Sequence, residues 1–136
     1  MPCIQISYIR ARHPPPRLDM QDRRHIVEKP WGHEEIWAKT NDYVGKILYI
    51  LDGHRLSLQI HKQKDETIRV LSGVLTLIYN DETLTLYPGD AKHIPPETVH
   101  RMEARNGDVA VVEVSTPQLD DVVRLDDDYK RIQLGP

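Results

Sequence analysis

The chain has 136 residues, a length typical of one domain, and 39% of them are hydrophobic, which is enough for a modest core. Its net charge of −3 at pH 7 gives no overall electrostatic reason to expect nucleic acid as a partner. The single cysteine, Cys3, excludes an intrachain disulfide framework and a thiolate metal cluster. No apolar run is long enough for a signal peptide or a membrane span, so we expect a cytoplasmic protein with no membrane partner.

Residues 1–24 are expected to form an N-terminal arm rather than part of the main domain. The run ARHPPPR at residues 11–17 favours extended polyproline geometry over a helix. The run IQISYI at residues 4–9 has a composition typical of a strand. The arm is therefore expected either to be flexible or to dock on a partner subunit.

Residues 25–117 are dense with short segments that alternate between apolar and polar side chains. The expected strands cover residues 33–38, 46–51, 55–61, 67–71, 74–80, 83–87, 91–94, 99–104 and 109–114. Ser72-Gly73 predicts a tight hairpin, and Asn80-Asp81 predicts the next turn. No convincing helical period occurs between residues 25 and 115, so the pattern predicts an all-β sandwich or barrel.

Residues 118–136 are expected to form an acidic C-terminal tail that packs on the barrel. The segment LDDVVRLDDDYKR, which begins at Leu119, shows no strong strand alternation. We therefore expect a short helical or irregular segment that closes one end of the barrel.

The strand at residues 55–61 carries the first indication of chemistry. Gln59 and His61 lie on one face of this strand, with Cα atoms roughly 6.5–7 Å apart, and Glu66 follows closely. Imidazole nitrogen and carboxylate oxygen suit a divalent transition metal such as zinc, manganese, iron or nickel. A further ligand must come from elsewhere, and His93 and His100 are the nearest downstream candidates. His93 is expected to face outward. Arg101 alternates away from His100 and is also expected to lie outside.

The opposite face of the same strand carries Leu56, Leu58 and Ile60. If Gln59 and His61 point into a barrel, these three side chains point out of it. An exposed aliphatic stripe is unfavourable by about 25 cal/mol per Å². We therefore expect another layer, the N-terminal arm or a second subunit to cover it, and we predict a homodimer.

Two spaced motifs resemble those of the cupin superfamily. The first comprises Gly53, Gln59, His61, Glu66 and Gly73, with Gln where most members have His, and the second comprises Gly89, Pro95 and His100. Both occur in the expected order and at the expected separation. The resemblance implies a cupin double-stranded β-helix, a jelly-roll barrel, with a metal inside it.

Four further stretches resemble the cupin domain of type II mannose-6-phosphate isomerases, which are often fused to mannose-1-phosphate guanylyltransferases. They are EKPWGHEEIW, RLSLQIHKQKDETIRVLSGVL, HIPPETVHRME and DDVVRLDDDYKR, and the resemblance covers roughly residues 27–131. It implies Gln59, His61, Glu66 and His100 as metal ligands, and it implies that Arg131 acts near the sugar. The family's aromatic pair after Glu66 is replaced here by Thr67 and Ile68.

The leading functional hypothesis is a metal-dependent aldose–ketose isomerase whose small-molecule substrate is a sugar phosphate. Lys64 and Arg131 are expected to hold anionic groups, and Glu113 or a residue of the tail is expected to act as the general base. Zinc is the expected cofactor, and manganese, iron, nickel and cobalt are alternatives. A non-catalytic metal-containing cupin that binds a sugar or sugar nucleotide, favoured by the missing aromatic pair, and a small iron dioxygenase are the other two hypotheses.

Overall fold

The structure is a computed structural model that describes residues 25–131, and these residues form strands and no helix. The strands are β1 (His25–Lys29), β2 (Gly32–Lys39), β3 (Val44–Ile50), β4 (Leu58–Ile60), β5 (Glu66–Ser72), β6 (Leu75–Tyr79), β7 (Glu82–Leu86), β8 (Ala91–Ile94), β9 (His100–Glu103), β10 (Val109–Ser115) and β11 (Val123–Asp126). The predicted all-β class is confirmed. The arm expected over residues 1–24 and the end of the tail, residues 132–136, lie outside the described part of the chain.

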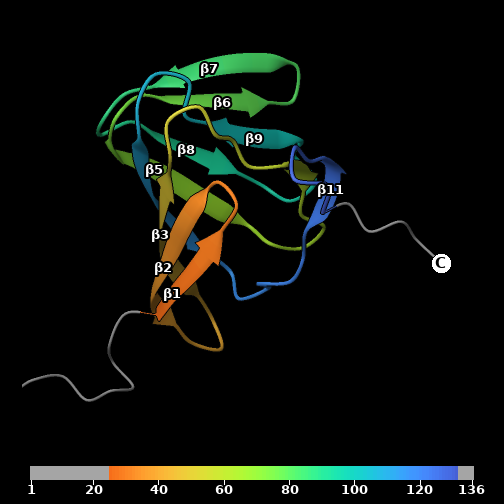
Figure 1. Cartoon of the computed structure of the whole chain (residues 1–136). Helices are drawn as coiled ribbons and strands as arrows, with labels where there is room; N and C mark the ends of the chain where they lie inside the picture. Colours follow the sequence, from red (N-terminus) through yellow and green to blue (C-terminus); the bar gives the residue numbers. More distant parts are fainter. Residues whose placement is uncertain (1–24, 132–136) are drawn as a thin grey trace, which may run out of the picture.

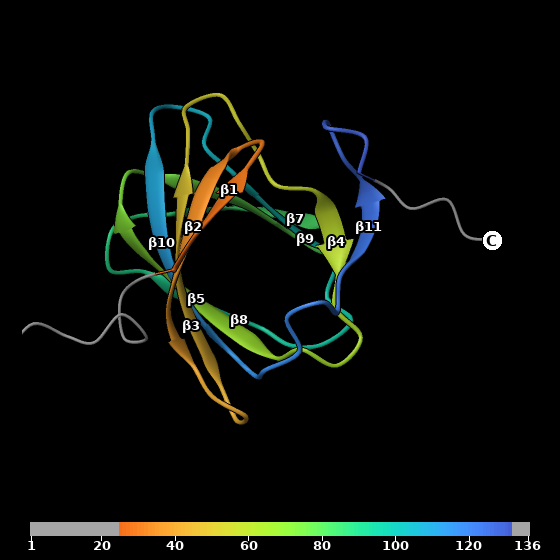
Figure 2. The same cartoon turned by 60° about the horizontal axis from the view of Figure 1, so that its bottom comes forward.

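The strands form two antiparallel sheets that face each other. The larger sheet has the order β1-β2-β3-β10-β5-β8, and the smaller has the order β11-β4-β9-β6-β7. Neighbours within each sheet are mostly distant in sequence, so the chain passes repeatedly between sheets, as in a jelly roll (Figure 1). Figure 2 shows β4 and β11 on the opposite side of the barrel from β3 and β10. All four strands contribute side chains to one interior cavity.

Strand alternation sorts the side chains of the larger sheet between the interior and the outer face. In β10, Val109, Val111 and Glu113 are buried, whereas Val114 is exposed. The buried apolar residues form one core cluster, comprising Trp31, Leu48, Ile50, Leu56, Ile68, Val70, Leu75, Leu77, Ile94, Met102, Ala104, Val109 and Val111. Glu113 is therefore a carboxyl group held on the inward face of a core strand.

One of the predicted hairpins is present and the other is not. Tyr79 pairs with Glu82, so Asn80-Asp81 joins β6 and β7 as a hairpin, with Asn80 at a φ of 51°. The hairpin predicted at Ser72-Gly73 is wrong, because β5 pairs with β10 and β8 and not with β6. Gly73 has a φ of 77°, and a Cβ there would lie 2.2 Å from the Asp108 carbonyl oxygen. Glycine is required at this point because the chain turns from one sheet to the other against the Asp108 backbone.

The aliphatic stripe predicted on the strand at residues 55–61 is wrong at Leu56. Strand β4 begins only at Leu58, and Leu56 is 8% exposed and belongs to the core cluster. Leu58 and Ile60 are half-buried. Alternation fails upstream of Leu58 because Leu56 and Ser57 lie outside the regular strand, where both side chains are buried.

The tail also differs from the helical or irregular segment that we expected. Val123–Asp126 form strand β11, which pairs antiparallel with β4 at the edge of the smaller sheet. Arg101 holds this edge: its Nε donates to the Leu56 carbonyl at 2.9 Å, and its Nη2 donates to the Asp126 side chain at 3.0 Å. The expectation that Arg101 is a solvated surface charge is therefore wrong, since only 5% of the residue is exposed.

Candidate metal centre

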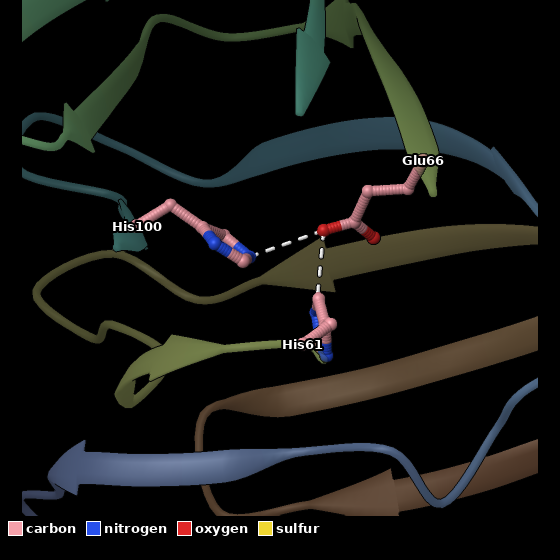
Figure 3. Close-up of side chains that lie close together, drawn as sticks. All are labelled: His61, Glu66 and His100. Carbon is pink, nitrogen blue, oxygen red and sulfur yellow. Dashed lines mark ion pairs between the residues drawn. The ribbon is translucent and has the colours of Figure 1, made fainter. Parts of the chain in front are cut away.

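His61, Glu66 and His100 come together in the interior. His61 follows β4 directly, Glu66 begins β5, and His100 begins β9. Glu66 Oε1 lies 3.3 Å from His61 Nε2 and 3.1 Å from His100 Nε2 (Figure 3). All three residues are buried, and one ligand atom of each lies within 4.8 Å of the others. Among the described residues, these three side chains are close enough together, and of the right chemical kind, to hold a metal ion.

Backbone carbonyls fix which nitrogen of each ring faces Glu66. His61 Nδ1 lies 2.5 Å from the Asp121 carbonyl oxygen, and His100 Nδ1 lies 2.9 Å from the Thr98 carbonyl oxygen. A carbonyl oxygen only accepts, so each Nδ1 carries a hydrogen, and in the neutral ring each Nε2 carries a lone pair. This arrangement, in which a second hydrogen bond orients the ring, is the usual one for a histidine that ligates a metal.

The inner atoms of this group fit a cation. His61 Nε2 and Glu66 Oε1 are buried and have no hydrogen-bond partner. With both rings neutral, lone pairs on Nε2 and Oε1 face one another, which is unfavourable unless a positive charge lies between them. Burial raises the pKa of Glu66, but the donors that face it, His100 and His61 first, and the charge of Lys64 hold the pKa well below its usual range. The two Nε2 atoms act as donors only when they carry hydrogens, and with both rings neutral a bound cation would supply the positive charge in their place. Glu66 is thus ionised, as a metal ligand must be.

Gln59 lies beside this group. Its Oε1 accepts a hydrogen bond from the Ser57 hydroxyl at 3.0 Å, and its Nε2 lies 3.5 Å from His100 Nε2. A half-turn of the amide would present the oxygen, which can ligate a metal, in place of the nitrogen, which cannot. The side chain is therefore placed to supply a neutral oxygen ligand.

Lys64 and Glu113 form a second buried pair behind Glu66. Lys64 Nζ donates to Glu113 Oε2 at 3.3 Å, and it lies 3.1 Å from Glu66 Oε2, an ion-pair distance without hydrogen-bond geometry. Burial and the nearby Glu66 carboxylate raise the pKa of Glu113 to about 8, although Lys64 opposes this. Burial lowers the pKa of Lys64, but Glu113 and Glu66 outweigh burial and raise it. Lys64 is charged, and Glu113 can hold a proton near neutral pH.

A cavity of about 650 Å³ opens onto these groups. Its charged and polar lining comes from both sheets and the tail and comprises Lys29, Glu34, Lys46, Ser57, Gln59, His61, Lys64, Glu113, Asp120, Arg124 and Arg131. The rest of the lining is apolar, including Trp31, Leu56 and Val123. This volume lies in the range of small-molecule sites.

The structure thus brings the residues singled out in the sequence to one place, with His93 as the exception. Gln59, His61, Lys64, Glu113 and Arg131 all line the cavity, and Glu66 and His100 lie directly beside His61. The side chain of His93 is 59% exposed and contacts Asp65 at 2.6 Å on the surface, as expected. His93 is therefore not available as a ligand.

Three cations of the cavity, Lys29, Lys46 and Arg124, were not among the site residues singled out in the sequence. Lys46 lies on the inward face of β3, and Arg124 lies on β11, opposite Gln59. The signal for Arg124 was weak because β11 is short and lies in an acidic stretch that we expected to be helical or irregular. Because β11 pairs with β4, Arg124 lies directly opposite Gln59 on the neighbouring strand.

Comparison with known proteins supports the same family as the sequence motifs. The family described as "Mannose-6-phosphate isomerase C-terminal" matches residues 17–127. The alginate biosynthesis protein AlgA of Pseudomonas aeruginosa is 31% identical over 131 residues, which cover 89% of this chain and 27% of that protein. The mannose-1-phosphate guanylyltransferase ManC of Salmonella typhimurium is 30% identical, over 85% of this chain and 26% of that protein. The chain spans about a quarter of the length of these relatives.

Solved structures confirm the predicted cupin fold. KdgF from a Halomonas species matches with a TM-score of 0.65 and 26% identity, over 76% of this chain and 94% of that one. An RmlC-like cupin from Shewanella frigidimarina matches with a TM-score of 0.66 and 12% identity, over 79% of this chain and 96% of that one. The predicted jelly-roll barrel is therefore a cupin barrel, as the two motifs indicated.

Proposed function

The chain belongs to the mannose-6-phosphate isomerase C-terminal family, and on that premise we propose that it is a metal-dependent aldose–ketose isomerase of a phosphorylated sugar. One observation carries the proposal. A possible metal site, His61, Glu66 and His100, lies beside a buried acid–base pair, Lys64 and Glu113, and both border one cavity. Isomerisation between adjacent carbons needs both features, because a carbonyl must be polarised and a proton must be moved.

His61, Glu66 and His100 would hold the metal, and Gln59 would add its amide oxygen. Two imidazoles, a carboxylate and a neutral oxygen suit zinc, our preferred ion, and are also compatible with manganese, iron, nickel and cobalt. When bound, a divalent ion supplies a Lewis acid for the carbonyl oxygen of the sugar. The carbonyls of Asp121 and Thr98 keep both Nε2 atoms directed at the site through their hydrogen bonds to Nδ1.

Glu113 is our candidate for the proton carrier. In its ionised form, Glu113 would take the proton from the carbon beside the carbonyl and return it to the neighbouring carbon. Lys64, 3.3 Å away, stabilises the carboxylate before the first transfer and again after the second. Burial, the largest cause of its raised pKa, makes the carboxyl group a stronger base than an exposed glutamate once it is ionised.

The non-catalytic sugar-binding cupin is the second candidate, and its main support came from Thr67 and Ile68. The structure places Ile68 in the core with 0% exposure and pairs Thr67 with His93 at the β5–β8 edge. Neither residue is part of the described lining of the cavity. The loss of the family's aromatic pair therefore affects the packing of β5 more directly than it affects the cavity.

The test is proton exchange at carbon 2 of mannose 6-phosphate in heavy water, with formation of fructose 6-phosphate followed in parallel. The zinc-loaded protein is expected to catalyse both, and chelation is expected to abolish both. Glu113→Gln should cut turnover by roughly 100-fold or more while metal stoichiometry stays unchanged. Lys39→Gln, an exposed cation on β2, is the matched control and should leave turnover intact.

A metal-loaded protein that shows no exchange with any member of a sugar-phosphate panel would contradict the isomerase proposal. Binding of those sugars without turnover would then favour the binding module. Oxygen uptake by the iron-loaded protein with a small organic substrate would instead support the dioxygenase hypothesis.

A further inference from the structure

The cations that line the cavity differ in whether a carboxylate of the protein already pairs with them. We propose that Arg124 is the residue that binds the anionic group of the ligand, and that this group is a phosphate. The inference rests on the proposed function for the class of ligand, but its structural basis is independent of whether the protein is catalytic. Sequence reasoning gave this role to Lys64 and Arg131 instead.

The other cations that line the cavity already face carboxylates. Lys46 Nζ lies 3.2 Å from Glu34 Oε1, and Lys29 Nζ lies 3.9 Å from the same oxygen. Lys64 lies between Glu66 and Glu113. Each of the three lysines thus already has an internal carboxylate as a partner, although Lys29 and Lys46 share the same one, and a ligand anion would have to compete with it.

The charge of Arg131 is balanced more completely than the charges of the lysines, because one carboxylate contacts it through both oxygens. Its Nε donates to Asp127 Oδ2 at 2.8 Å and its Nη2 donates to Asp127 Oδ1 at 3.1 Å, so both carboxylate oxygens face the guanidinium. The Asp127 side chain is fully buried. Removing Arg131 from this pair would leave a buried carboxylate without its partner, which is strongly unfavourable.

Arg124 differs from all of these. Within residues 25–131 it takes part in no ion pair, and its Nε is buried without a hydrogen-bond partner. A buried guanidinium N–H that lacks an acceptor is unfavourable, and a ligand oxygen would satisfy it. Arg124 lines the same cavity as Gln59, His61 and Glu113.

The position of Arg124 also sets its relation to the metal site. It is the direct antiparallel partner of Gln59, so the two Cα atoms lie about 4.5–5.5 Å apart. Its neighbours Val122 and Val123 add apolar surface beside the guanidinium, which strengthens a charge–charge contact there, and Asp120 lies further along the same wall. A small ligand could therefore place an oxygen at the metal site and an anionic group against β11.

The planar fork of a guanidinium matches two oxygens of a phosphate or a carboxylate at once. A phosphate monoester offers more acceptor oxygens than a carboxylate, and it is the group that the proposed substrate carries. We therefore expect the phosphate to be preferred, and the experiment includes a carboxylate arm, a hexuronic acid, to separate the two.

The experiment measures binding of inorganic phosphate, mannose 6-phosphate, mannose and a hexuronic acid to the zinc-loaded full chain by calorimetry. Arg124→Gln should weaken binding of phosphate and mannose 6-phosphate by roughly 10- to 100-fold and leave mannose unaffected. Arg124→Lys keeps the charge without the fork and should fall between the two. Lys39→Gln removes one exposed positive charge elsewhere and should have no effect. Metal content and the unfolding midpoint are measured for every variant.

The outcomes separate this inference from the proposed function. Phosphate binding that depends on Arg124 supports the inference even if no isomerisation occurs, and then only the isomerase proposal fails. Full-strength phosphate binding in a folded, metal-loaded Arg124→Gln overturns the inference, whether or not the protein is an isomerase. No detectable phosphate or sugar-phosphate binding in the unsubstituted protein overturns it as well. Tighter binding of the hexuronic acid than of mannose 6-phosphate overturns the choice of phosphate.

Discussion

Two backbone carbonyls decide the chemistry of the two histidines. Asp121 and Thr98 each accept the Nδ1 hydrogen of one ring, so both Nε2 atoms are directed at Glu66. A histidine on a strand without such a partner could present either nitrogen. The sequence spacing predicts which residues approach one another, but these hydrogen bonds determine which atoms do.

We predict that His61→Ala and His100→Ala each abolish binding of one divalent ion per chain. Each change removes one of the two nitrogen donors, and the remaining ligands cannot replace it. Metal content of the purified variants, measured by elemental analysis, checks this. His93→Ala is the matched control, because His93 is exposed and lies outside the site, and it should retain the ion. Full stoichiometry in either ligand variant would show that the ligand assignment is wrong.

Protons compete with the metal for the same Nε2 atoms, so affinity should fall as the solution is made acidic. The affinity of the unsubstituted protein is measured by competition with a chelator of known affinity at several pH values. An affinity that did not change between neutral and mildly acidic pH would argue against histidine ligands.

At the scale of elements, alternation predicted strands at β2 to β10 but missed β1 and β11, and it did not predict the partners. The expected strand at residues 109–114 corresponds closely to β10, because Val109, Val111 and Glu113 all face the interior. The partners of β5 could not be read from local sequence, since Gly73 permits a turn within a sheet as well as one between sheets. Pairing between strands distant in sequence depends on the closure of the whole barrel.

The candidate metal ligands were predictable because the spacing of the two motifs can be recognised without knowing which strands pair. The roles of the cations in the cavity were harder to predict from the sequence. Lys64 and Glu113 were named for separate roles, and only the structure shows that they are a pair. Arg124 was missed because its role depends on β11 lying beside β4, and four residues in an acidic segment carry little strand signal.

Asp127 holds the chain just beyond β11 and makes the stability of this element depend on pH. Its buried carboxylate accepts the Arg131 backbone N–H at 2.7 Å as well as the guanidinium. Burial raises the pKa of Asp127, but the hydrogen bonds from Arg131 outweigh it and lower the pKa to about 2. Because the folded pKa is below the unfolded value of about 3.8, this stability is complete above about pH 4 and is lost as pH falls toward 2.

We predict that Asp127→Asn lowers the free energy of unfolding by about 2 kcal/mol at pH 7. The difference between the unsubstituted protein and the variant should shrink between about pH 4 and pH 2. Urea unfolding of both proteins at several pH values measures this difference in free energy. Other carboxylates titrate in both proteins, so their contributions cancel when one value is subtracted from the other. Asp42→Asn, an exposed residue in the turn between β2 and β3, is the control. A difference that stayed constant down to pH 2 would show that the carboxylate is not the source of this stability.

At the scale of the whole molecule, the outer face of the larger sheet carries large exposed apolar side chains. Trp37 and Val114 are 51% and 49% exposed, and Leu71 of β5 is 48% exposed on the same face. The Trp37 ring lies over Gly45, whose β10 partner is Val114, so the first two side chains are neighbours. Exposed apolar area of this kind is typical of a surface that binds another protein.

We predict that the chain forms a homodimer through this outer face rather than through the stripe at Leu58 and Ile60. Leu58 and Ile60 are half-buried, whereas Trp37 and Val114 have about half of their surface available for burial against a second copy. Val114→Glu would place a charge in that interface and should shift the protein to a monomer in sedimentation experiments at micromolar concentration. Leu58→Glu, tested in parallel, distinguishes the two surfaces. If Leu58→Glu dissociates a dimer that Val114→Glu leaves intact, the smaller sheet makes the contact. If the unsubstituted full chain sediments as a monomer, the homodimer prediction is wrong, and the outer face would then be exposed to solvent in the isolated protein.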